Sequence, residues 1–405
     1  MFIRNLKVSG LLSFGPQGID LPMENLNVLI GPNGSGKSNL LEVLALLRAS
    51  PNNLPEPVKE MGGVRAWLWS GTWADVDRLR FTPREVAPRP PYRSRTAVID
   101  AVIDSQPLAR IRHFLEFCEH GGRFEVLDEH IGLETPAVSP TGSDFVYRYR
   151  EGDPVLNDSS GESRALAREN LKPEESILSQ VRDPERYPEL HWLQENYEQI
   201  SLHRNWSFGP AAPLRREQST HARADTLSDG GENLALVLSK IRSRVKNELL
   251  ESLRKLFDGI DDFGISVEGG TALLFLEEAG GRVIPATRLS DGTLRYLCLL
   301  AILHHPEPPP LIAIEEPELG LHPDILPHIA ELLVRASERT QLVVTTHSRQ
   351  LVDALSDHPS SVVVCSKENG ESRFERLDAD ALSAWLDRYS LGDLWSKGEL
   401  GGNRW

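Results

Sequence analysis

The chain has 405 residues and a formal net charge of −15; 40% of its residues are hydrophobic and 25% are charged. This composition is typical of a soluble globular protein, long enough for one large α/β domain with an insertion or for two domains. The acidic balance argues against a surface covered with positive charge for nucleic acid, although a local basic stripe is compatible with it.

The cysteines and the apolar runs indicate the compartment. Cys118, Cys298 and Cys365 are far apart, have apolar neighbours and lack the spacing of a zinc site. We expect buried thiols in a reducing environment. No apolar run reaches the length of a membrane span, and the first residues lack a secretory pattern. The expectation is a cytoplasmic protein that does not enter a membrane.

The first elements predict a strand, a turn and a second strand. Residues 2–8 alternate apolar and polar side chains, as a half-buried strand does, and residues 11–21 lead through a turn into another strand. An apolar run then ends at Gly31, and a leucine-rich helical segment runs from Ser38 to about Ala49. A glycine-rich turn therefore joins a strand to a helix.

This turn, residues 31–38, matches the phosphate-binding pattern G-x-x-x-x-G-K-[ST] at every specified position. Its glycines let successive N–H groups point at a polyphosphate, and the helix directs its positive dipole end at the same anion. We expect Lys37 to reach the β- and γ-phosphates and Ser38 to hold Mg²⁺. The nucleotide-binding residues predicted here are Gly31, Pro32, Asn33, Gly34, Ser35, Gly36, Lys37, Ser38 and Asn39. The alternative, a chance glycine-rich turn, leaves the preceding strand and following helix unexplained.

Residues 62–95 are rich in arginine and contain Trp67, Trp69 and Trp73. They are compatible with a nucleic-acid surface. The other interpretation is a pair of strands whose arginines are solvated or paired. Further antiparallel strands are expected at residues 96–103, 111–117 and 123–127 because these are rich in β-branched and aromatic side chains.

Residues 135–225 change in composition, with proline, serine, glycine and charged residues in excess. We expect an insertion that is partly loop, with short helical pieces around residues 165–171, 174–181 and 190–200. Its basic end predicts an exposed or partner-facing loop. The basic residues there are Arg204, Arg215, Arg216, His221 and Arg223.

A long amphipathic helix is predicted from Asp229 to Leu256, with Asp229 and Glu232 spaced as a capping box. Its basic face is either solvated or a lever that contacts DNA or a partner. Residues 263–267 and 271–276 then predict a hairpin.

The second half of the predicted site begins at residues 289–293, which precede an apolar helix over residues 294–303. A serine and a glycine at a helix start, here Ser290 and Gly292, offer a hydroxyl and free N–H groups to an anion. Residues 311–316 follow as a buried strand that ends in acidic residues. Such strands deliver carboxylates to the edge of an open α/β sheet where ligands bind.

Two glutamates and a histidine end these buried strands. We expect Glu315 to hold Mg²⁺, through water, and Glu316 to polarise the attacking water as general base. The alternative is a pair of surface glutamates. His347 follows another buried strand, residues 341–346, and is predicted to contact the γ-phosphate; the alternative is a structural histidine.

These motifs together resemble those of ABC-type ATPases. In that family the Walker A loop, signature motif, Walker B strand, D-loop and switch histidine occur in this order. The corresponding segments here are residues 31–38, 289–292, 311–316 and 318–323, and His347. The form of the last three segments, with a tail at residues 391–402, is most similar to stand-alone ATPases of the SMC/RecF/OLD branch.

The resemblance implies an α/β ABC-type head with a mixed sheet, an antiparallel β subdomain and a helical and loop insertion. It also implies ATP and Mg²⁺ as ligands, and a homodimer or higher oligomer in which Ser290 and Gly292 complete the partner's phosphate site. Three departures affect this expectation. Asp291 replaces a glycine of the transporter-type signature, Glu315 replaces an aspartate, and no Q-loop glutamine is identifiable beyond Gln106.

The tetrapeptide of the signature also occurs at residues 227–230. We prefer the copy at residues 289–292, because it lies directly upstream of the Walker B strand. The expected division of the chain is an N-terminal ATPase lobe over 1–134, the insertion over 135–225, a C-terminal ATPase lobe over 226–360 and an extension over 361–405.

Two functions fit these features. The first is an ATP-hydrolysing, dimerising switch that acts on DNA or controls a separate effector, such as a TOPRIM or other nuclease, in anti-phage defence or genome maintenance. The second is a sensor or scaffold that holds a toxic effector with little turnover. Asp378 and Asp380 match a TOPRIM D-x-D only superficially and are expected to open a helix over residues 381–389, so no nuclease activity is expected from this chain alone. A transporter subunit is disfavoured by the amino-terminal hairpin, the long insertion and the altered signature.

Overall fold

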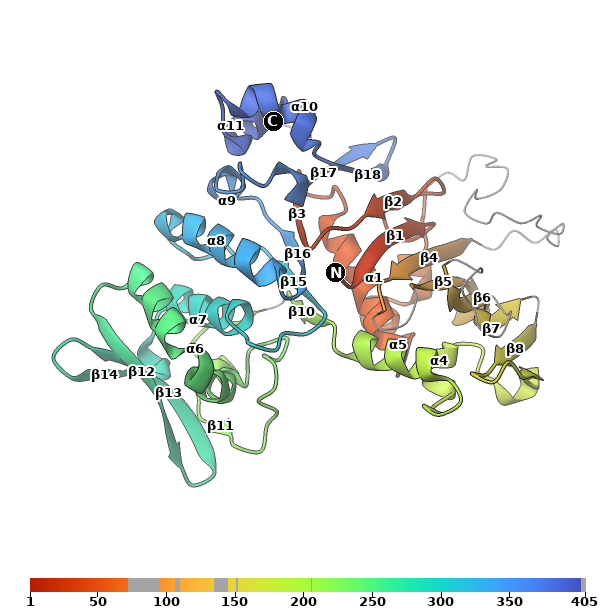
Figure 1. Cartoon of the computed structure of the whole chain (residues 1–405), viewed down its shortest axis with the longest axis horizontal. Coiled ribbons are helices and arrows are strands. Elements are labelled where there is room, and N and C mark those ends of the chain that lie inside the picture. Colours follow the sequence, from red (N-terminus) through yellow and green to blue (C-terminus); the bar gives the residue numbers. More distant parts are fainter. Residues whose placement is uncertain (72–94, 106–109, 135–144, 151, 205, 402–405) are drawn as a thin grey trace.

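The computed structural model describes residues 1–71, 95–105, 110–134, 145–150, 152–204 and 206–401. At its centre six strands form a sheet in the order β10-β15-β16-β3-β17-β18 (Figure 1). Neighbours from β10 to β17 are parallel, and β18 is antiparallel to β17. The strands are β3 (Leu26–Ile30), β10 (Ser201–His203), β15 (Leu311–Glu315), β16 (Gln341–Thr345), β17 (Val362–Glu368) and β18 (Glu371–Arg376).

Both faces of the sheet are buried at β3, β15 and β16, which explains why these strands are mainly apolar runs. Along β3, Val28 and Ile30 belong to one hydrophobic core and Leu29 to the other. The first core contains side chains of α6 (Leu234–Leu256), α7 (Asp291–Leu303), α8 (Leu326–Ser337) and α9 (Arg349–Asp353). The second contains side chains of α1 (Lys37–Ala49), α4 (Ile177–Gln180) and α5 (Pro188–Glu198). The central sheet therefore separates two lobes.

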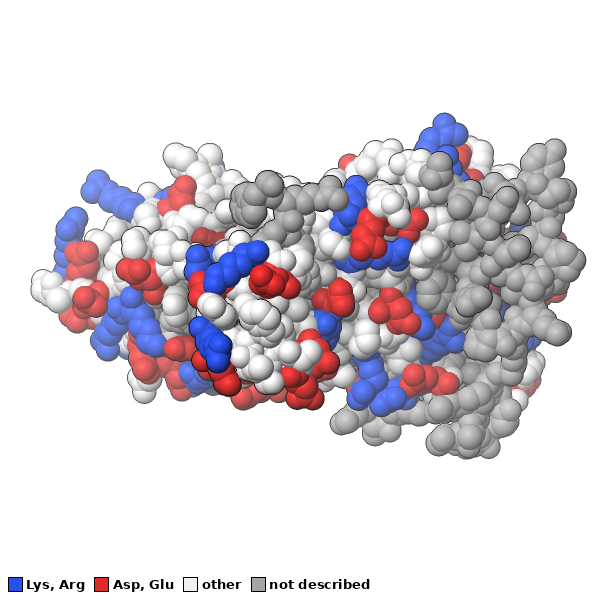
Figure 2. All heavy atoms as spheres, turned by 90° about the horizontal axis from the view of Figure 1, so that it is seen from above, with Lys and Arg blue, Asp and Glu red and all other residues white. Residues whose placement is uncertain are grey.

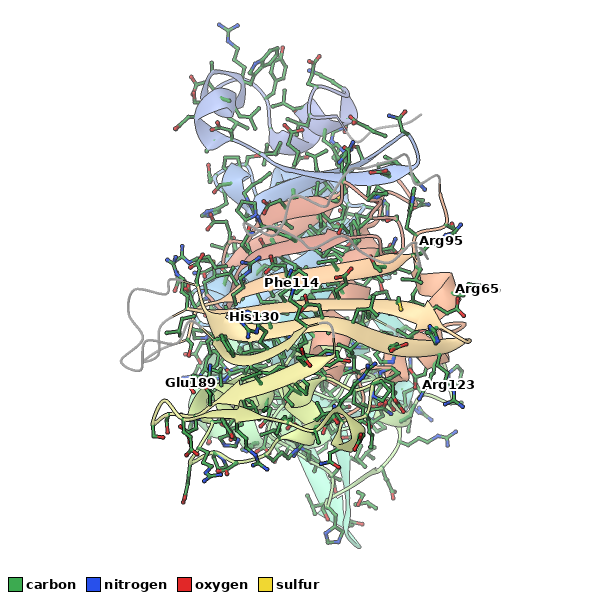
Figure 3. The ribbon with its side chains drawn as sticks, turned by 90° about the vertical axis from the view of Figure 1, so that its right-hand side faces the viewer. Arg65, Arg95, Phe114, Arg123, His130 and Glu189 are labelled. Atoms are coloured by element: carbon green, nitrogen blue, oxygen red, sulfur yellow. The ribbon has the colours of Figure 1, made fainter. Side chains whose placement is uncertain are left out.

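An eight-stranded antiparallel sheet, seen face on in Figure 3, covers the second core. The strands predicted at residues 96–103, 111–117 and 123–127 are confirmed within it. In order along the sheet the strands are β2 (Ile19–Pro22), β1 (Ile3–Ser9), β4 (Thr96–Ile103), β5 (Ile111–His120), β6 (Arg123–Leu133), β7 (Phe145–Arg150), β8 (Asp153–Asn157) and β9 (Ser163–Ala165).

A third, smaller sheet lies beside α6 at the lower left of Figure 1. The predicted hairpin is confirmed in it as β12 (Ile260–Glu268) and β13 (Thr271–Glu278). The other two strands are β11 (Gln218–Ser219) and β14 (Arg282–Pro285). The short helices α2 (Glu56–Glu60) and α3 (Val64–Trp67) follow α1, and α10 (Ala379–Leu386) and α11 (Leu391–Ser396) lie near the end of the chain.

Two local predictions differ from the structure. The helix predicted from Asp229 begins at Leu234 and has no capping box, because Asp229 pairs with Arg48 and Glu232 accepts a hydrogen bond from Ser228. The helical piece predicted around residues 165–171 is instead the end of strand β9 followed by a 3-10 turn. In both places contacts distant in sequence or in the sheet override the local pattern.

The tryptophan-rich stretch is partly inside the protein. Trp67 and Trp69 are buried and so do not form a nucleic-acid surface, and Trp73 lies outside the described residues. Arg65 and Arg95 are exposed at one end of the strands of the eight-stranded sheet (Figure 3), and Arg65 pairs with Glu119 at 3.6 Å. The pair of strands expected in this stretch is absent from its described part, where Val64–Trp67 form α3. The other arginines of the stretch lie outside the described residues.

Two further predictions, on the cysteines and on Asp378, are borne out. All three cysteines are buried. Asp378 caps α10 by accepting hydrogen bonds from the amides of Asp380 and Ala381, as the predicted helix start requires. Within the described residues no helix is both long and apolar enough to cross a membrane.

Gln341 joins the central sheet to the antiparallel sheet. Its Oε1 accepts a hydrogen bond from the Ile3 amide at 2.7 Å, and its Nε2 donates to the carbonyls of Ile3 at 2.7 Å and Glu24 at 3.0 Å. The side chain is 1% exposed. One buried amide thus satisfies three backbone groups from elements more than 300 residues away.

Replacing Gln341 by leucine removes its three hydrogen bonds to backbone groups in a buried place, although the Glu24 carbonyl still accepts from Asn27 Nδ2 at 2.6 Å. We expect Gln341→Leu to lower the free energy of unfolding by about 2–4 kcal/mol. Urea denaturation followed by circular dichroism measures this. The exposed Gln199→Leu is the control, with an expected change below about 0.5 kcal/mol. Equal effects of the two substitutions would contradict the role given to Gln341.

Candidate functional site

The glycine-rich turn after β3 forms a close cradle. A Cβ at Gly31 would lie 2.1 Å from the carbonyl oxygen of Cys365, and one at Gly36 would lie 2.3 Å from Ser372 Oγ. Both glycines have positive φ. Side chains at either position would therefore clash with β17 or β18 as well as strain the backbone. Gly34, in contrast, has open space beside it.

Lys37 lies over this turn. Its Nζ donates to the carbonyls of Gly31 at 2.7 Å and Pro32 at 3.1 Å. Burial lowers the pKa of Lys37, while the nearby carboxylates of Glu316 and Glu315 oppose that shift. The ammonium group therefore has acidic neighbours but only loop carbonyls as hydrogen-bond acceptors.

The turn fits a triphosphate. Ser35 Oγ is buried and has no hydrogen-bond partner among the described residues. Glycine backbone, a buried lysine and an unused hydroxyl are the donor set that binds phosphate oxygens. Asn39 donates from Nδ2 to Ser13 Oγ at 2.6 Å, which ties the start of α1 to the neighbouring loop.

Ser38 and Glu315, the residues predicted to bind metal, contact each other. Ser38 Oγ donates a hydrogen bond to Glu315 Oε1. Glu315 is the last residue of β15, and its side chain is 21% exposed. A hydroxyl and a carboxylate are oxygen ligands that suit Mg²⁺, so the two residues fit that ion.

Glu316 lies just beyond β15 in a left-handed conformation with φ of 48°. This conformation is uncommon for residues other than glycine and recurs at functional sites. The Glu316 amide donates to the Thr345 carbonyl at 3.0 Å, and the Glu316 carbonyl accepts from Arg295 Nη1 at 3.2 Å. The backbone is held on both sides while the carboxylate stays accessible, with 31% of the side chain exposed.

His347 lies beside Glu316. Its Nε2 is 3.7 Å from Glu316 Oε1, beyond hydrogen-bonding distance. Burial lowers the pKa of His347, and the charge of Lys37 lowers it further. The carboxylates of Glu316 and Glu318 oppose this shift. In its neutral form the imidazole can donate from one ring nitrogen and accept at the other.

Glu318 positions His347, a role that the sequence did not predict. Its Oε1 accepts hydrogen bonds from Thr346 Oγ1 at 2.7 Å and from the His347 amide at 2.8 Å. The loop after β15 is thereby joined to the end of β16. An acidic residue two positions beyond Glu316 was the available signal, but its partner could not be read from the sequence.

The predicted signature residues start α7. Ser290 Oγ caps the helix by accepting from the Thr293 amide at 3.1 Å. A Cβ at Gly292 would lie 2.5 Å from the Gly320 carbonyl oxygen, so the helix start packs closely on the loop after β15. Among the described residues no hydrogen bond joins residues 289–292 to residues 31–38.

A buried arginine holds this helix start. Arg215 donates to the carbonyls of Leu289 at 2.5 Å and Phe208 at 2.7 Å, and it pairs with Asp291. The aspartate that departs from the transporter-type signature thus has a specific partner. Arg204 also is mostly buried, between Glu42 and Glu315. The expectation that these two arginines form an exposed loop was wrong.

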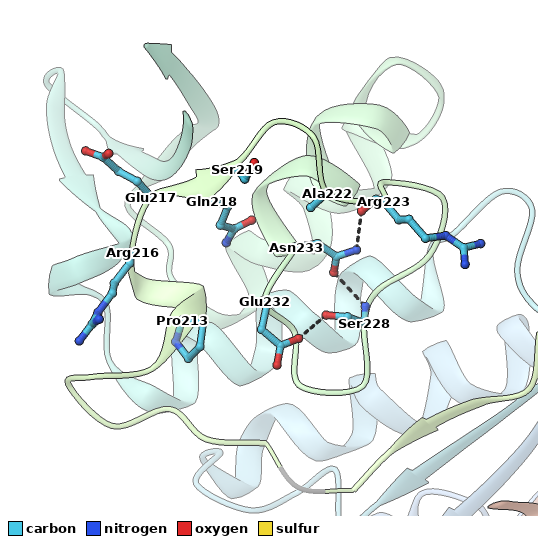
Figure 4. Close-up of a pocket in the computed structure, with 10 residues that line it drawn as sticks. All are labelled: Pro213, Arg216, Glu217, Gln218, Ser219, Ala222, Arg223, Ser228, Glu232 and Asn233. Carbon is cyan, nitrogen blue, oxygen red and sulfur yellow. Dashed lines mark hydrogen bonds between the residues drawn. The ribbon is translucent and has the colours of Figure 1, made fainter. Parts of the chain in front are cut away.

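The earlier copy of the tetrapeptide lies elsewhere. Ser228, next to Glu232 and Asn233, lines a cavity of about 440 Å³ (Figure 4). Asn233 accepts from the Ser228 amide and donates to the Arg223 carbonyl there. The residues that line this cavity do not include those of the phosphate turn. Gln106, the Q-loop candidate, lies outside the described residues.

The basic face of α6 is neutralised by neighbours. Each basic side chain that suggested a DNA-facing lever contacts an acceptor instead. Lys240 pairs with Asp225, Arg242 and Lys246 with Asp262, Arg244 with Glu307, Lys255 with Glu331, and Arg254 donates to backbone carbonyls. On the face seen in Figure 2 acidic and basic side chains are interspersed.

Comparisons with known proteins agree with this geometry. A crystal structure of an Smc head bound to the C-winged helix domain of ScpA shares 14% sequence identity, with a TM-score of 0.57 over 94% of this chain and 99% of that chain. The Smc head domain with an extended coiled coil bound to the C-terminal domain of ScpA, derived from Pyrococcus furiosus, shares 13% identity, with a TM-score of 0.52 over 95% and 98%. At these identities the likeness concerns the fold.

A search of curated proteins found no match. A family described as "AAA domain, putative AbiEii toxin, Type IV TA system" matches residues 26–353, from the start of β3 to the end of α9. That span contains all the residues predicted to bind nucleotide or metal. The family model covers most of the chain, so the chain belongs to this AAA family, and its fold resembles that of the Smc head domains.

Proposed function

We propose that the chain binds and hydrolyses ATP and uses the cycle to dimerise. The observation that carries this proposal is the convergence of Lys37, Ser38, Glu315, Glu316 and His347 at the ends of three adjacent parallel strands, β15, β16 and β3. Ligands of open α/β sheets collect at such an edge.

The site residues divide the chemistry among them. Residues 31–39 hold the phosphates, and Lys37 moves from its loop carbonyls to the β- and γ-phosphates. Ser38 and Glu315 would hold Mg²⁺, which neutralises phosphate charge when bound. Glu316 accepts the proton of the attacking water as general base. His347, neutral and adjacent, donates to the γ-phosphate.

The position of the signature helix supports an ATP sandwich between two copies. Side chains of α1 belong to one hydrophobic core and those of α7 to the other, so the two helices lie on opposite faces of the central sheet. Ser290 and Gly292 then reach a triphosphate on a second copy. In this arrangement each copy completes the other's site, as in closed two-fold dimers.

The output that we propose is control of a separate effector, such as a nuclease, in anti-phage defence or genome maintenance. The toxin–antitoxin description of the family supports this context. The Smc heads of similar fold were solved with a bound ScpA domain, which supports partner binding by such a head. The paired charges of α6 give less support to direct DNA contact. The alternative is a scaffold that holds a toxic effector with little turnover.

Two substitutions separate binding from hydrolysis. We expect Lys37→Ala to weaken binding of fluorescent ATP by about 10- to 100-fold, because a charged contact to phosphate is lost. Glu316→Gln should keep binding and slow phosphate release by about 10²- to 10⁴-fold. The exposed Lys59→Ala and Glu338→Gln are the matched controls and should resemble the unmodified chain.

The same pair distinguishes switch from scaffold. If the biological output survives in Glu316→Gln but not in Lys37→Ala, the scaffold is favoured. If both variants lose the biological output, the hydrolysing switch is favoured. Normal phosphate release by Glu316→Gln would contradict the role of this glutamate.

Mixing two inactive variants tests the shared site. Lys37→Ala lacks a phosphate site and Ser290→Arg blocks the signature surface, so each alone should release little phosphate. A mixed dimer keeps one complete site, so equal mixing should restore up to about a quarter of the unmodified rate. Phosphate release and light scattering with ATP measure this. Failure of the mixture to exceed either variant would contradict the trans arrangement.

A further inference from the structure

Arg204 lies beside the two residues that we assign to Mg²⁺. Strands β10 and β15 are parallel with His203 opposite Ile314, which brings the next residues, Arg204 and Glu315, to the same level. Arg204 Nε lies 3.5 Å from Glu315 Oε2, and Arg204 Nη2 donates to Glu42 Oε1 at 2.6 Å. One guanidinium therefore bridges a carboxylate at the end of β15 and a carboxylate of α1.

These three side chains are largely shielded from water. Arg204 is 18% exposed, Glu42 12% and Glu315 21%. Burial by itself would lower the pKa of Arg204, but the hydrogen bond to Glu42 and the charges of Glu42 and Glu315 raise it overall. The guanidinium is charged at every physiological pH. With Ser38 on the other oxygen, both oxygens of Glu315 have a donor or a cation of the protein beside them.

The same residues would form a metal site if the guanidinium were absent. The Glu315 carboxylate, the Ser38 hydroxyl bonded to it and the Glu42 carboxylate one turn further along α1 are the hard oxygen ligands that divalent cations prefer. The guanidinium lies between the two carboxylates, and its positive charge repels an arriving cation at short range. A triphosphate bound at the neighbouring turn would add negative charge and further oxygen ligands. A bound cation would then be favoured over the ion pairs that Arg204 makes in its absence.

We propose that Arg204 is an internal counter-ion that makes divalent-cation binding at Ser38 and Glu315 conditional on bound nucleotide. The inference rests on the proposed function, because it takes these two residues as the magnesium ligands. Arg204 acts through Glu42 and Glu315 and is in this sense a positioning residue. The cation then enters with the triphosphate, and the protein without nucleotide stays free of metal at this site.

The test uses Mn²⁺ as the probe and the purified full chain without nucleotide. Electron paramagnetic resonance of free Mn²⁺ gives the affinity. We expect weak binding by the unmodified chain and binding tighter by about tenfold or more in Arg204→Gln, because a unit charge next to the site is removed. Arg204→Lys keeps the charge and should stay near the unmodified chain.

Two controls locate the effect. Glu42→Gln combined with Arg204→Gln should lose the gain, since one of the two carboxylates is gone. The exposed Arg123→Gln makes the same substitution away from the site and should leave Mn²⁺ affinity unchanged. Melting temperatures without metal verify that each variant is folded.

The unmodified chain alone can overturn the inference. If it binds Mn²⁺ without nucleotide as tightly as with a non-hydrolysable ATP analogue, cation binding does not depend on nucleotide. The inference is then overturned, whatever the variants do. A folded Arg204→Gln with unmodified Mn²⁺ affinity also overturns it. Fluorescent ATP binding in the same samples separates the two proposals: no nucleotide binding contradicts the proposed function, whereas nucleotide binding with unconditional Mn²⁺ binding overturns this inference alone.

Discussion

The site depends on the parallel pairing of β3, β16 and β15. Backbone hydrogen bonds continue beyond the strands, from the Thr346 amide to the Leu29 carbonyl at 3.1 Å and from the Glu316 amide to the Thr345 carbonyl at 3.0 Å. Parallel strands end at a common edge of the sheet. The backbone pairing alone therefore brings together the residues that follow the strands, and no contact between their side chains is required. Residues at least 277 positions apart, such as Ser38 and Glu315, thus meet at one edge.

Much of this site could be predicted because its signals are local. The glycine turn at residues 31–38 needs only its own spacing, and the buried strands at residues 311–316 and 341–346 show as continuous apolar runs. Antiparallel strands such as β4 were found for the same reason, since their side chains carry a strong strand preference. The order of the motifs along the chain then supplied the overall fold.

The predictions failed where a side chain depends on a distant partner. Arg204 and Arg215 look like members of a basic loop, yet Glu42 and Asp291, which accept from them, lie 162 and 76 positions away. The prediction of where α6 begins failed for the same reason, because the carboxylate of Asp229, expected to cap the helix, pairs with Arg48 instead. Sequence spacing predicts which residues are neighbours within a few turns of a helix. Whether a charged side chain is buried depends on the whole fold and cannot be predicted from that spacing.

The contact of Gly31 and Gly36 with Cys365 and Ser372 has a consequence for how the protein is made. The turn that cradles phosphate is synthesised first, but the hairpin on which it leans, β17 and β18, leaves the ribosome more than 300 residues later. Chains still in synthesis therefore carry the glycine turn without its supporting wall. The turn therefore acquires its final close packing only after translation has passed the last strand of the central sheet.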